Sequence, residues 1–148
     1  MNENVIKVDT QLGILRPVSD VFDAIVNPHK MCAYFTTTAT EPMGPVKTIT
    51  WTWDDYEAVH DIRVQKVKRD SFISFNWSAS GVETLVEIFL ESKGDNSTLV
   101  KITEREWPAD YKGASQCMGQ TGGWTHFLCC LKAYVEYNIN LRAGGVIK

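Results

Sequence analysis

The sequence predicts an α+β domain in which a curled six-stranded antiparallel sheet wraps around one long C-terminal helix. Residues 122–141 carry apolar side chains at three- and four-residue steps, which places them on one broad stripe of a helix. Most of the chain before this stretch alternates apolar and polar residues, which is typical of half-buried strands. The stripe needs an apolar partner, and a sheet is the one that the rest of the sequence offers.

The first part of the chain predicts one strand followed by two short helices. Residues 6–14 alternate apolar and polar side chains, and Pro17 stops this strand. Apolar residues then follow at helical spacing over residues 18–26, and Pro17 suits the first turn of that helix. Asn27 and Pro28 break the helix and begin a second short one.

Five further strands are expected before the long helix, and the short turns between them predict a meander in which sequential strands pair. These strands span residues 49–53, 58–67, 72–77, 82–90 and 98–104. A twisted sheet of this size curls, yet it cannot lie flush against a single helix along its whole length. A mostly apolar cavity between sheet and helix is therefore expected, and such cavities are where small ligands bind.

Length and charge limit the classes of function. The chain has 148 residues and is most simply one domain over residues 1–148. Lys plus Arg is 15 and Asp plus Glu is 18, a net charge of −3, which argues against a nucleic-acid partner. No apolar run approaches the ~20 residues that cross a bilayer, and no charged-then-apolar leader opens the chain, so we expect no membrane association.

The cysteines indicate a reducing compartment. The four of them, Cys32, Cys117, Cys129 and Cys130, have no spacing that builds a disulfide framework. Reduced thiols are the simplest interpretation, and together with the absence of a leader they predict a cytoplasmic protein.

The phases of the expected elements assign residues to the cavity. The sheet side comprises Trp51, Trp53, His60, Ile62, Phe75, Trp77, Val86, Ile88, Val100, Ile102 and Glu104. The helix side comprises Trp124, Phe127, Leu128 and Leu131, and Tyr34 and Phe35 close one end. The alternative is that these residues pack against one another as a dry core.

Two polar residues stand out on the expected apolar wall. His60 and Glu104 each alternate with apolar residues of their strands, so both are expected to point inward. An imidazole and a carboxylate in one cavity could orient a polar head group or act as acid and base. Alternatively, each lies near a strand end and reaches water, where Arg63, Arg105 or Lys101 neutralises the glutamate.

No metal or cofactor is expected. His126, Cys129 and Cys130 have the i, i+3, i+4 spacing that metal ligands on a helix can have. They lie away from the apolar stripe, however, and no second ligand pair has matching spacing, so solvated or packed side chains are the better interpretation. No phosphate-binding loop, dinucleotide fingerprint or nucleophile elbow is present. The glycine-rich residues 119–123 are interpreted as flexibility near the start of the long helix.

Three segments of the sequence support a family resemblance. They are PVSDVFDAIVNPHKMCAYF at residues 17–35, VKITEREWP at residues 100–108 and GWTHFLCCLKAYVE at residues 123–136. With the order of elements, they resemble the helix-grip fold of the START and birch-pollen-allergen superfamily, often called SRPBCC. More narrowly, the chain resembles the domain named after the C-terminal part of the activator of the heat-shock protein 90 ATPase. This resemblance implies the fold and a range of functions: binders, cyclases, dehydratases and co-chaperones.

We therefore expect a non-enzymatic binder of a small hydrophobic or amphipathic molecule. The five tryptophans on or beside the expected cavity favour this function, because indole offers a large apolar face with one hydrogen-bond donor. One alternative is an enzyme of the cyclase or dehydratase type that uses His60 and Glu104. The other is a protein-interaction module that, like the co-chaperone, binds a chaperone through an exposed apolar patch.

Overall fold

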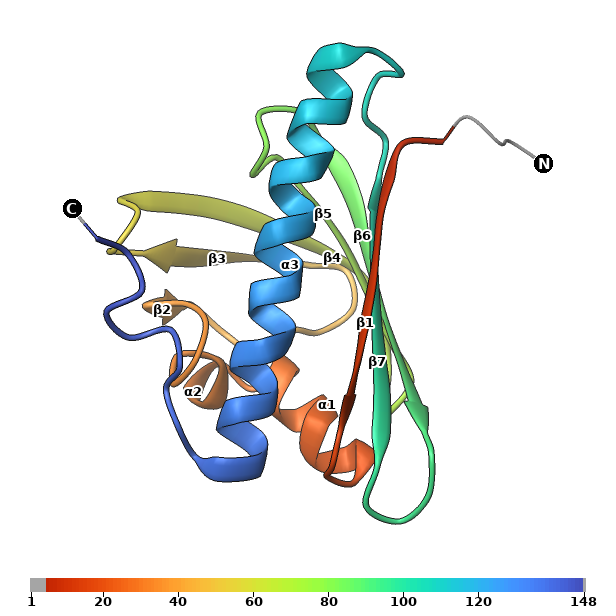
Figure 1. Ribbon diagram of the computed structural model, residues 1–148, viewed down its shortest axis with the longest axis vertical. Helices are drawn as coiled ribbons and strands as arrows, with labels where there is room; N and C mark the ends of the chain where they lie inside the picture. Colours follow the sequence, from red (N-terminus) through yellow and green to blue (C-terminus); the bar gives the residue numbers. More distant parts are fainter. Residues whose placement is uncertain (1–4, 148) are drawn as a thin grey trace.

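The computed structural model describes residues 5–147, and Figure 1 shows one long helix lying across a strongly twisted sheet. The elements in chain order are β1 (Lys7–Ile14), α1 (Val18–Val26), α2 (Pro28–Met31), β2 (Thr38–Ala39), β3 (Lys47–Trp53), β4 (Ala58–Lys68), β5 (Phe72–Trp77), β6 (Thr84–Ser92), β7 (Thr98–Arg105) and α3 (Tyr111–Tyr137). No helix within residues 5–147 is long and apolar enough to span a membrane.

The sheet is antiparallel throughout and open, with the order β1-β7-β6-β5-β4-β3-β2. The predicted α+β class and the meander from β3 to β7 are confirmed. The predicted number of six strands is wrong, because residues 5–147 contain seven. The additional strand, β2, pairs only Thr38 with Thr52 and Ala39 with Trp51. Two residues are too few to produce a period-two pattern in the sequence.

The long helix begins earlier and ends earlier than residues 122–141. Asp110 caps its N-terminus, since the carboxylate oxygen Oδ1 accepts a hydrogen bond from the backbone N–H of Gly113 at 2.8 Å. Asn138 ends the helix in the left-handed conformation, with φ 55° and ψ 39°. The glycine-rich residues 119–123 are therefore helical rather than a flexible connection. A glycine costs a helix only about 1 kcal/mol, which the packing of the flanking turns outweighs.

The two short helices lie where the sequence predicted them and support one end of α3 (Figure 1). The side chain of Asn27 caps α2 by accepting a hydrogen bond from the backbone N–H of His29 at 3.0 Å. Buried Tyr34 follows α2 and donates its hydroxyl hydrogen to the carbonyl of Ala24 at 3.0 Å. This bond fixes the segment after α2 against α1, and it places the neighbouring Phe35 beside α3.

A buried carboxylate joins the C-terminal turn of α3 to the corner between β1 and α1. Glu136 accepts hydrogen bonds from the backbone N–H of Leu15 at 2.9 Å and from Lys132 Nζ at 2.6 Å. Arg16 donates to the backbone carbonyl of Glu136 at 2.5 Å. The helix is thus fixed at this end to the edge strand of the sheet.

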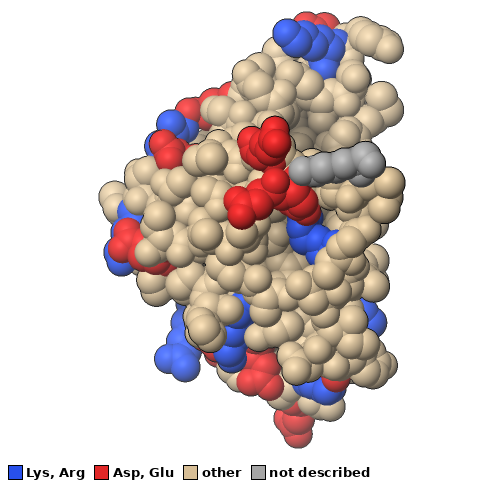
Figure 2. Space-filling model, turned by 90° about the vertical axis from the view of Figure 1, so that its left-hand side faces the viewer, with Lys and Arg blue, Asp and Glu red and all other residues tan. Residues whose placement is uncertain are grey.

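Charge is unevenly distributed over the surface. Figure 2 shows the side of the molecule at which the β3–β4 turn and the C-terminal segment lie, and most of this face is uncharged. Acidic side chains gather near its middle, whereas basic side chains lie mainly below them and toward the edges. The β3–β4 turn itself contributes Asp54, Asp55 and Glu57.

Candidate ligand-binding cavity

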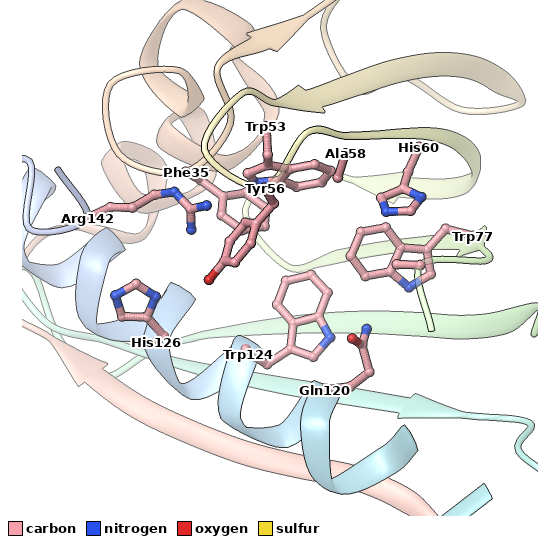
Figure 3. A pocket seen from close by; sticks show the side chains of 12 residues that line it. Phe35, Trp53, Tyr56, Ala58, His60, Trp77, Gln120, Trp124, His126 and Arg142 are labelled. Atoms are coloured by element: carbon pink, nitrogen blue, oxygen red, sulfur yellow. The ribbon is translucent and has the colours of Figure 1, made fainter. Parts of the chain in front are cut away.

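A cavity of about 330 Å³ lies between the β3–β5 part of the sheet and α3 (Figure 3). Its lining consists of aromatic rings, three small residues and a few polar groups: Phe35, Trp53, Tyr56, Ala58, His60, Trp77, Ala79, Gln120, Gly123, Trp124, His126 and Arg142. The cavity has a sheet wall, a helix wall and an end wall that the segment after α3 contributes. It therefore lies where the curled sheet departs from the helix.

Aromatic rings in tilted and edge-to-face contact build the rigid part of the lining. The ring centroids of Trp77 and Trp124 are 5.5 Å apart, and those of Trp53 and Phe35 are 5.3 Å apart. The imidazole of His60 lies 6.0 Å from the Trp77 ring. Because each ring is held by its neighbours, the aromatic wall is preformed and presents flat apolar faces to the cavity (Figure 3).

Three small residues leave the space that the rings do not fill. Ala58 lies directly opposite Trp53 in the register of β3 and β4, and Ala79 follows β5. On the helix wall, a Cβ atom added to Gly123 would meet no heavy atom within 4 Å. A larger side chain at any of these positions would enter the cavity. The small residues thus determine its volume.

Behind the aromatic wall lies a completely buried carboxylate, that of Glu104 on β7. Its Oε1 accepts hydrogen bonds from the indole N–H of Trp124 at 2.7 Å and from the amide of Gln120 at 3.1 Å. Its Oε2 accepts from the indole N–H of Trp77 at 3.0 Å and from the hydroxyl of Thr84 at 2.6 Å. Both oxygens are therefore occupied by neutral donors that come from β5, β6 and α3.

The alternative in which Glu104 reaches water near a basic side chain is wrong. Glu104 is 0% exposed, because α3 covers this end of β7. The three basic residues considered for its neutralisation pair elsewhere: Arg63 with Glu83, Arg105 with Glu87 and Lys101 with Asp9. Within residues 5–147, the contacts of Glu104 include no lysine or arginine.

His60 lines the cavity but does not form a hydrogen-bonded pair with Glu104. Trp77 contacts both residues, with its ring toward His60 and its N–H toward Glu104. Partial burial lowers the pKa of the His60 imidazole, which favours its neutral form at pH 7. The site therefore contains a neutral imidazole at the cavity and a fully hydrogen-bonded carboxylate behind it.

The end wall comes from the segment after α3. The guanidinium of Arg142 donates to both carboxylate oxygens of Asp55 in the β3–β4 turn, at 3.1 and 2.8 Å. It also lies over the ring of Tyr56, 5.2 Å from the centroid. A second cavity of about 400 Å³ lies beyond this arginine and shares Arg142 and Phe35 with the first. Arg142 thus separates two adjoining spaces.

The residues predicted for the cavity divide between the lining and the core. Phe35, Trp53, His60, Trp77 and Trp124 line the cavity, and Tyr34 lines the second one. The following lie in the buried core instead: Trp51, Ile62, Phe75, Val86, Ile88, Val100, Ile102, Phe127, Leu128 and Leu131. All of them point inward as their strand or helix phase predicted. They fill the region where α3 packs close to the sheet, and space remains only toward one end.

Several lining residues carried no recognised signal in the sequence. Gln120 precedes Gly123 by three residues and Trp124 by four, so extending the helix toward its true start would have placed Gln120 beside both of them. Ala58 shares the strand phase of His60 but is too small to attract notice. Arg142 reaches the site only through tertiary contacts, for which the local sequence holds no signal.

The cysteines and His126 do not form a metal centre among residues 5–147, which contain no group of three or more metal-binding side chains. Cys130 is buried, and its Sγ lies 3.4 Å from Nε2 of His126. Cys129 is exposed on another face of α3. The expectation that all three lie away from the apolar stripe is wrong, because Cys130 belongs to the buried core and His126 lines the cavity.

Comparison with solved structures places this architecture among known proteins. The protein SSP2350 from Staphylococcus saprophyticus is 30% identical, with a TM-score of 0.80 over 93% of this chain and 97% of that one. The Aha1 dimer from Colwellia psychrerythraea shares the fold at 20% identity, with a TM-score of 0.74 over 89% of this chain and 97% of that one. DynU16, from the dynemicin biosynthetic locus, shares it at 23% identity and a TM-score of 0.80, over 91% of this chain and 49% of that one.

The sequence itself also matches a family. No curated protein matches this chain. The sequence model of the family described as activator of Hsp90 ATPase homolog 1-like protein matches residues 16–136, which include α1, the strands from β2 to β7 and nearly all of α3. The resemblance seen in the sequence is confirmed, and the chain belongs to the activator of Hsp90 ATPase homolog 1-like family.

Proposed function

We propose that this protein binds a small hydrophobic or amphipathic molecule in the cavity between β3–β5 and α3. The observation that carries the proposal is a preformed space of about 330 Å³ to which five aromatic residues, Phe35, Trp53, Tyr56, Trp77 and Trp124, contribute lining. Pockets for small organic molecules have volumes of roughly 300–1,000 Å³ and combine an apolar lining with a few polar groups. This cavity has both properties.

The polar groups of the lining are few and well separated. Gln120 and His126 lie on the helix wall, His60 lies on the sheet wall, and Tyr56 lies at the end near Arg142 (Figure 3). Such an arrangement suits a ligand whose apolar body contacts the indole rings and whose polar end is oriented by one of these groups.

Binding without turnover agrees best with the geometry of the two titratable candidates. General acid–base catalysis needs a group within hydrogen-bond reach of the substrate with a lone pair or proton to exchange. The carboxylate of Glu104 is fully buried, and both of its oxygens already accept hydrogen bonds. Among residues 5–147, no carboxylate pairs with His60 to orient its ring, and Trp77 lies against it instead.

Filling the cavity from the helix wall tests this proposal. Gly123 faces the cavity and Gly122 does not, yet an added Cβ meets no neighbour within 4 Å at either position. Gly123→Leu and Gly122→Leu are therefore matched substitutions in the same turn of α3. Native mass spectrometry of the protein purified from its own host is expected to show an additional mass that is released on denaturation.

The expected result is that Gly122→Leu retains this additional mass and Gly123→Leu loses it. Circular dichroism and thermal melting of both variants establish that each is folded. If Gly123→Leu carried the same mass as the unaltered protein, the ligand would occupy a different site and the proposal would be wrong.

A further inference from the structure

The charge on Glu104 has no counter-charge within the described part of the chain. Its four partners, Trp77, Thr84, Gln120 and Trp124, are all neutral and all donate a hydrogen to it. A carboxyl group that accepts at both oxygens has the hydrogen-bond pattern of an ionised carboxylate. Buried charges are normally paired with an opposite charge, because a lone one is costly in a medium of low dielectric constant.

Two of these partners connect the charge with the cavity. Trp77 and Trp124 each donate the indole N–H to Glu104 and contribute the same ring to the cavity lining. A negative charge at the N–H edge strengthens the negative potential of the ring face, which is the part of an indole that attracts cations. The apolar faces of these two rings should therefore attract a cation more strongly than the faces of indoles without such a charge would.

The amide of Gln120 supports the same preference. Its Nε2 must face Glu104, because a carboxylate can only accept hydrogen bonds. The carbonyl oxygen Oε1 is then the amide atom left to interact with a ligand, since Gln120 also lines the cavity. That oxygen accepts a hydrogen bond from a ligand N–H and has none to donate.

Two further ionisable groups of the lining, Arg142 and His60, do not oppose a cation. Arg142 is neutralised by Asp55, to which it donates twice. Partial burial lowers the pKa of His60, so its ring is uncharged at pH 7. The adjoining β3–β4 turn adds the exposed carboxylates of Asp54 and Glu57, and acidic side chains gather on that face in Figure 2. These charges favour the approach of a positive ligand.

We propose that the molecule bound in this cavity is an organic cation with an apolar body, whose positive charge lies against the Trp77 and Trp124 rings and balances Glu104. This inference depends on the proposed function, because it names the chemical class of the ligand for the same cavity. A protonated amine would also donate to Gln120, whereas a quaternary ammonium group would bind through the rings alone.

A series of probes with one body and different charges tests the inference. The probes are 4-phenylbutylamine, which is protonated at pH 7, 4-phenylbutyltrimethylammonium, 4-phenylbutanol and 4-phenylbutyrate. Isothermal titration calorimetry with the full chain is expected to show both cations binding about tenfold more tightly than the alcohol, the size of a cation–π contribution in a partly desolvated site. The carboxylate is expected to bind most weakly. Loss of binding in Gly123→Leu locates the site.

Matched variants test whether Glu104 is the source of the preference. In Glu104→Gln, the affinities for the amine and the alcohol are expected to come within about twofold of each other. Glu136→Gln is the control, because Glu136 is also buried but pairs with Lys132. This control is expected to keep the tenfold preference. If Glu104→Gln does not fold, the comparison of the four probes on the unaltered chain decides by itself whether the cavity prefers a cation.

The outcomes separate the two proposals. Binding of the alcohol or the carboxylate as tightly as the amine would overturn the assignment of a cation and leave a ligand-binding cavity in place. Failure of all four probes to bind at millimolar concentration would count against both proposals. Stronger binding of the amine than of the quaternary probe would support the cation and identify Gln120 as its hydrogen-bond acceptor.

Discussion

Trp124 donates its indole N–H to Oε1 of Glu104 over 2.7 Å, and this contact joins α3 to β7 behind the cavity. The other oxygen of the same carboxylate receives the indole N–H of Trp77 from β5. One buried side chain therefore fixes the orientation of two rings that line the cavity. A change at Glu104 should affect the stability of the fold as well as the properties of the site.

Glu104→Gln is expected to lower the free energy of unfolding by about 1–3 kcal/mol, the cost of leaving one buried donor without an acceptor. The glutamine has one oxygen where the carboxylate has two, so its NH₂ group must face the indole N–H of either Trp77 or Trp124. Urea unfolding followed by circular dichroism measures the change.

Glu83→Gln is the control for that measurement. Glu83 makes an exposed ion pair with Arg63, and the same chemical change there should alter stability by less than about 0.5 kcal/mol. Equal effects of the two substitutions would show that the hydrogen bonds of Glu104 contribute no net stability.

Two helical glycines of α3 are expected to respond to alanine in opposite directions. At Gly119 an added Cβ meets no heavy atom within 4 Å, so Gly119→Ala should stabilise the protein by about 0.5–1 kcal/mol through the higher helix propensity of alanine. At Gly113 a Cβ would lie 1.9 Å from the carbonyl oxygen of Pro108, so the first turn of the helix must move. Gly113→Ala should therefore destabilise the protein. Thermal melting of both variants measures the two shifts, and a rise in both melting temperatures would contradict the close approach at Gly113.

Arg142 and Asp55 are expected to be energetically coupled. The guanidinium donates twice to the carboxylate, and the arginine side chain is only 13% exposed, so a double-mutant cycle with alanine should give about 1 kcal/mol of coupling. The exposed pair of Arg63 and Glu83 should give less than about 0.5 kcal/mol in the same cycle.

Removal of the Arg142 side chain is also expected to open the end wall of the cavity. Acrylamide should then quench the tryptophan fluorescence of Arg142→Ala more strongly than that of the unaltered protein, because Trp53 and Trp124 line the same space. Arg63→Ala removes an arginine that does not line the cavity and serves as the control. Unchanged quenching in Arg142→Ala would show that the arginine does not close the cavity.

The residues on the inner face of the sheet could be predicted from the sequence, because the alternation of side chains along a strand is a local property. His60 and Glu104 were expected to point inward, and the structure places His60 at the cavity and Glu104 buried behind it. The partners of Glu104 could not be predicted in the same way. Trp77 and Trp124 reach it from β5 and α3, and their approach depends on the curl of the sheet, which no local pattern encodes.

The start of α3 and the strand β2 were missed for different reasons. Residues 111–121 contain two glycines and no regular apolar stripe, so the local preference for helix is weak and the Asp110 cap is the main local signal. The two residues of β2 carry no periodicity at all, and their pairing with β3 follows from the position of the chain after α2. Gln120 precedes the expected helix, and Gly123 was interpreted as flexibility at its start, so neither was anticipated in the lining of the cavity.

The buried carboxylate of Glu136 is expected to make stability depend on acid pH. Burial by itself raises the pKa of Glu136, but hydrogen bonds from Lys132 and the backbone N–H of Leu15, with the charges of Lys132 and Arg16, outweigh it. The pKa in the folded protein is therefore below its ordinary value of 4.5. At pH values below about 4.5 the unfolded chain binds the proton more readily, so protonation favours unfolding. Glu136 should contribute its full stabilisation above that pH and lose it as the pH falls through the lower pKa of the folded state.

Urea unfolding of the unaltered protein and of Glu136→Gln at pH 7, 5, 4 and 3 measures this contribution. The difference in unfolding free energy between the two proteins should be constant from pH 7 to 5 and should shrink toward pH 3. Glu91→Gln is the matched control, because Glu91 is exposed and pairs only with Lys93, so its difference should stay small at every pH. A difference for Glu136→Gln that persists unchanged at pH 3 would mean that the carboxyl group is equally easy to protonate in the folded and unfolded chains. The link between α3 and the β1–α1 corner would then depend on Arg16 and the backbone carbonyl of residue 136 rather than on the charge of the side chain.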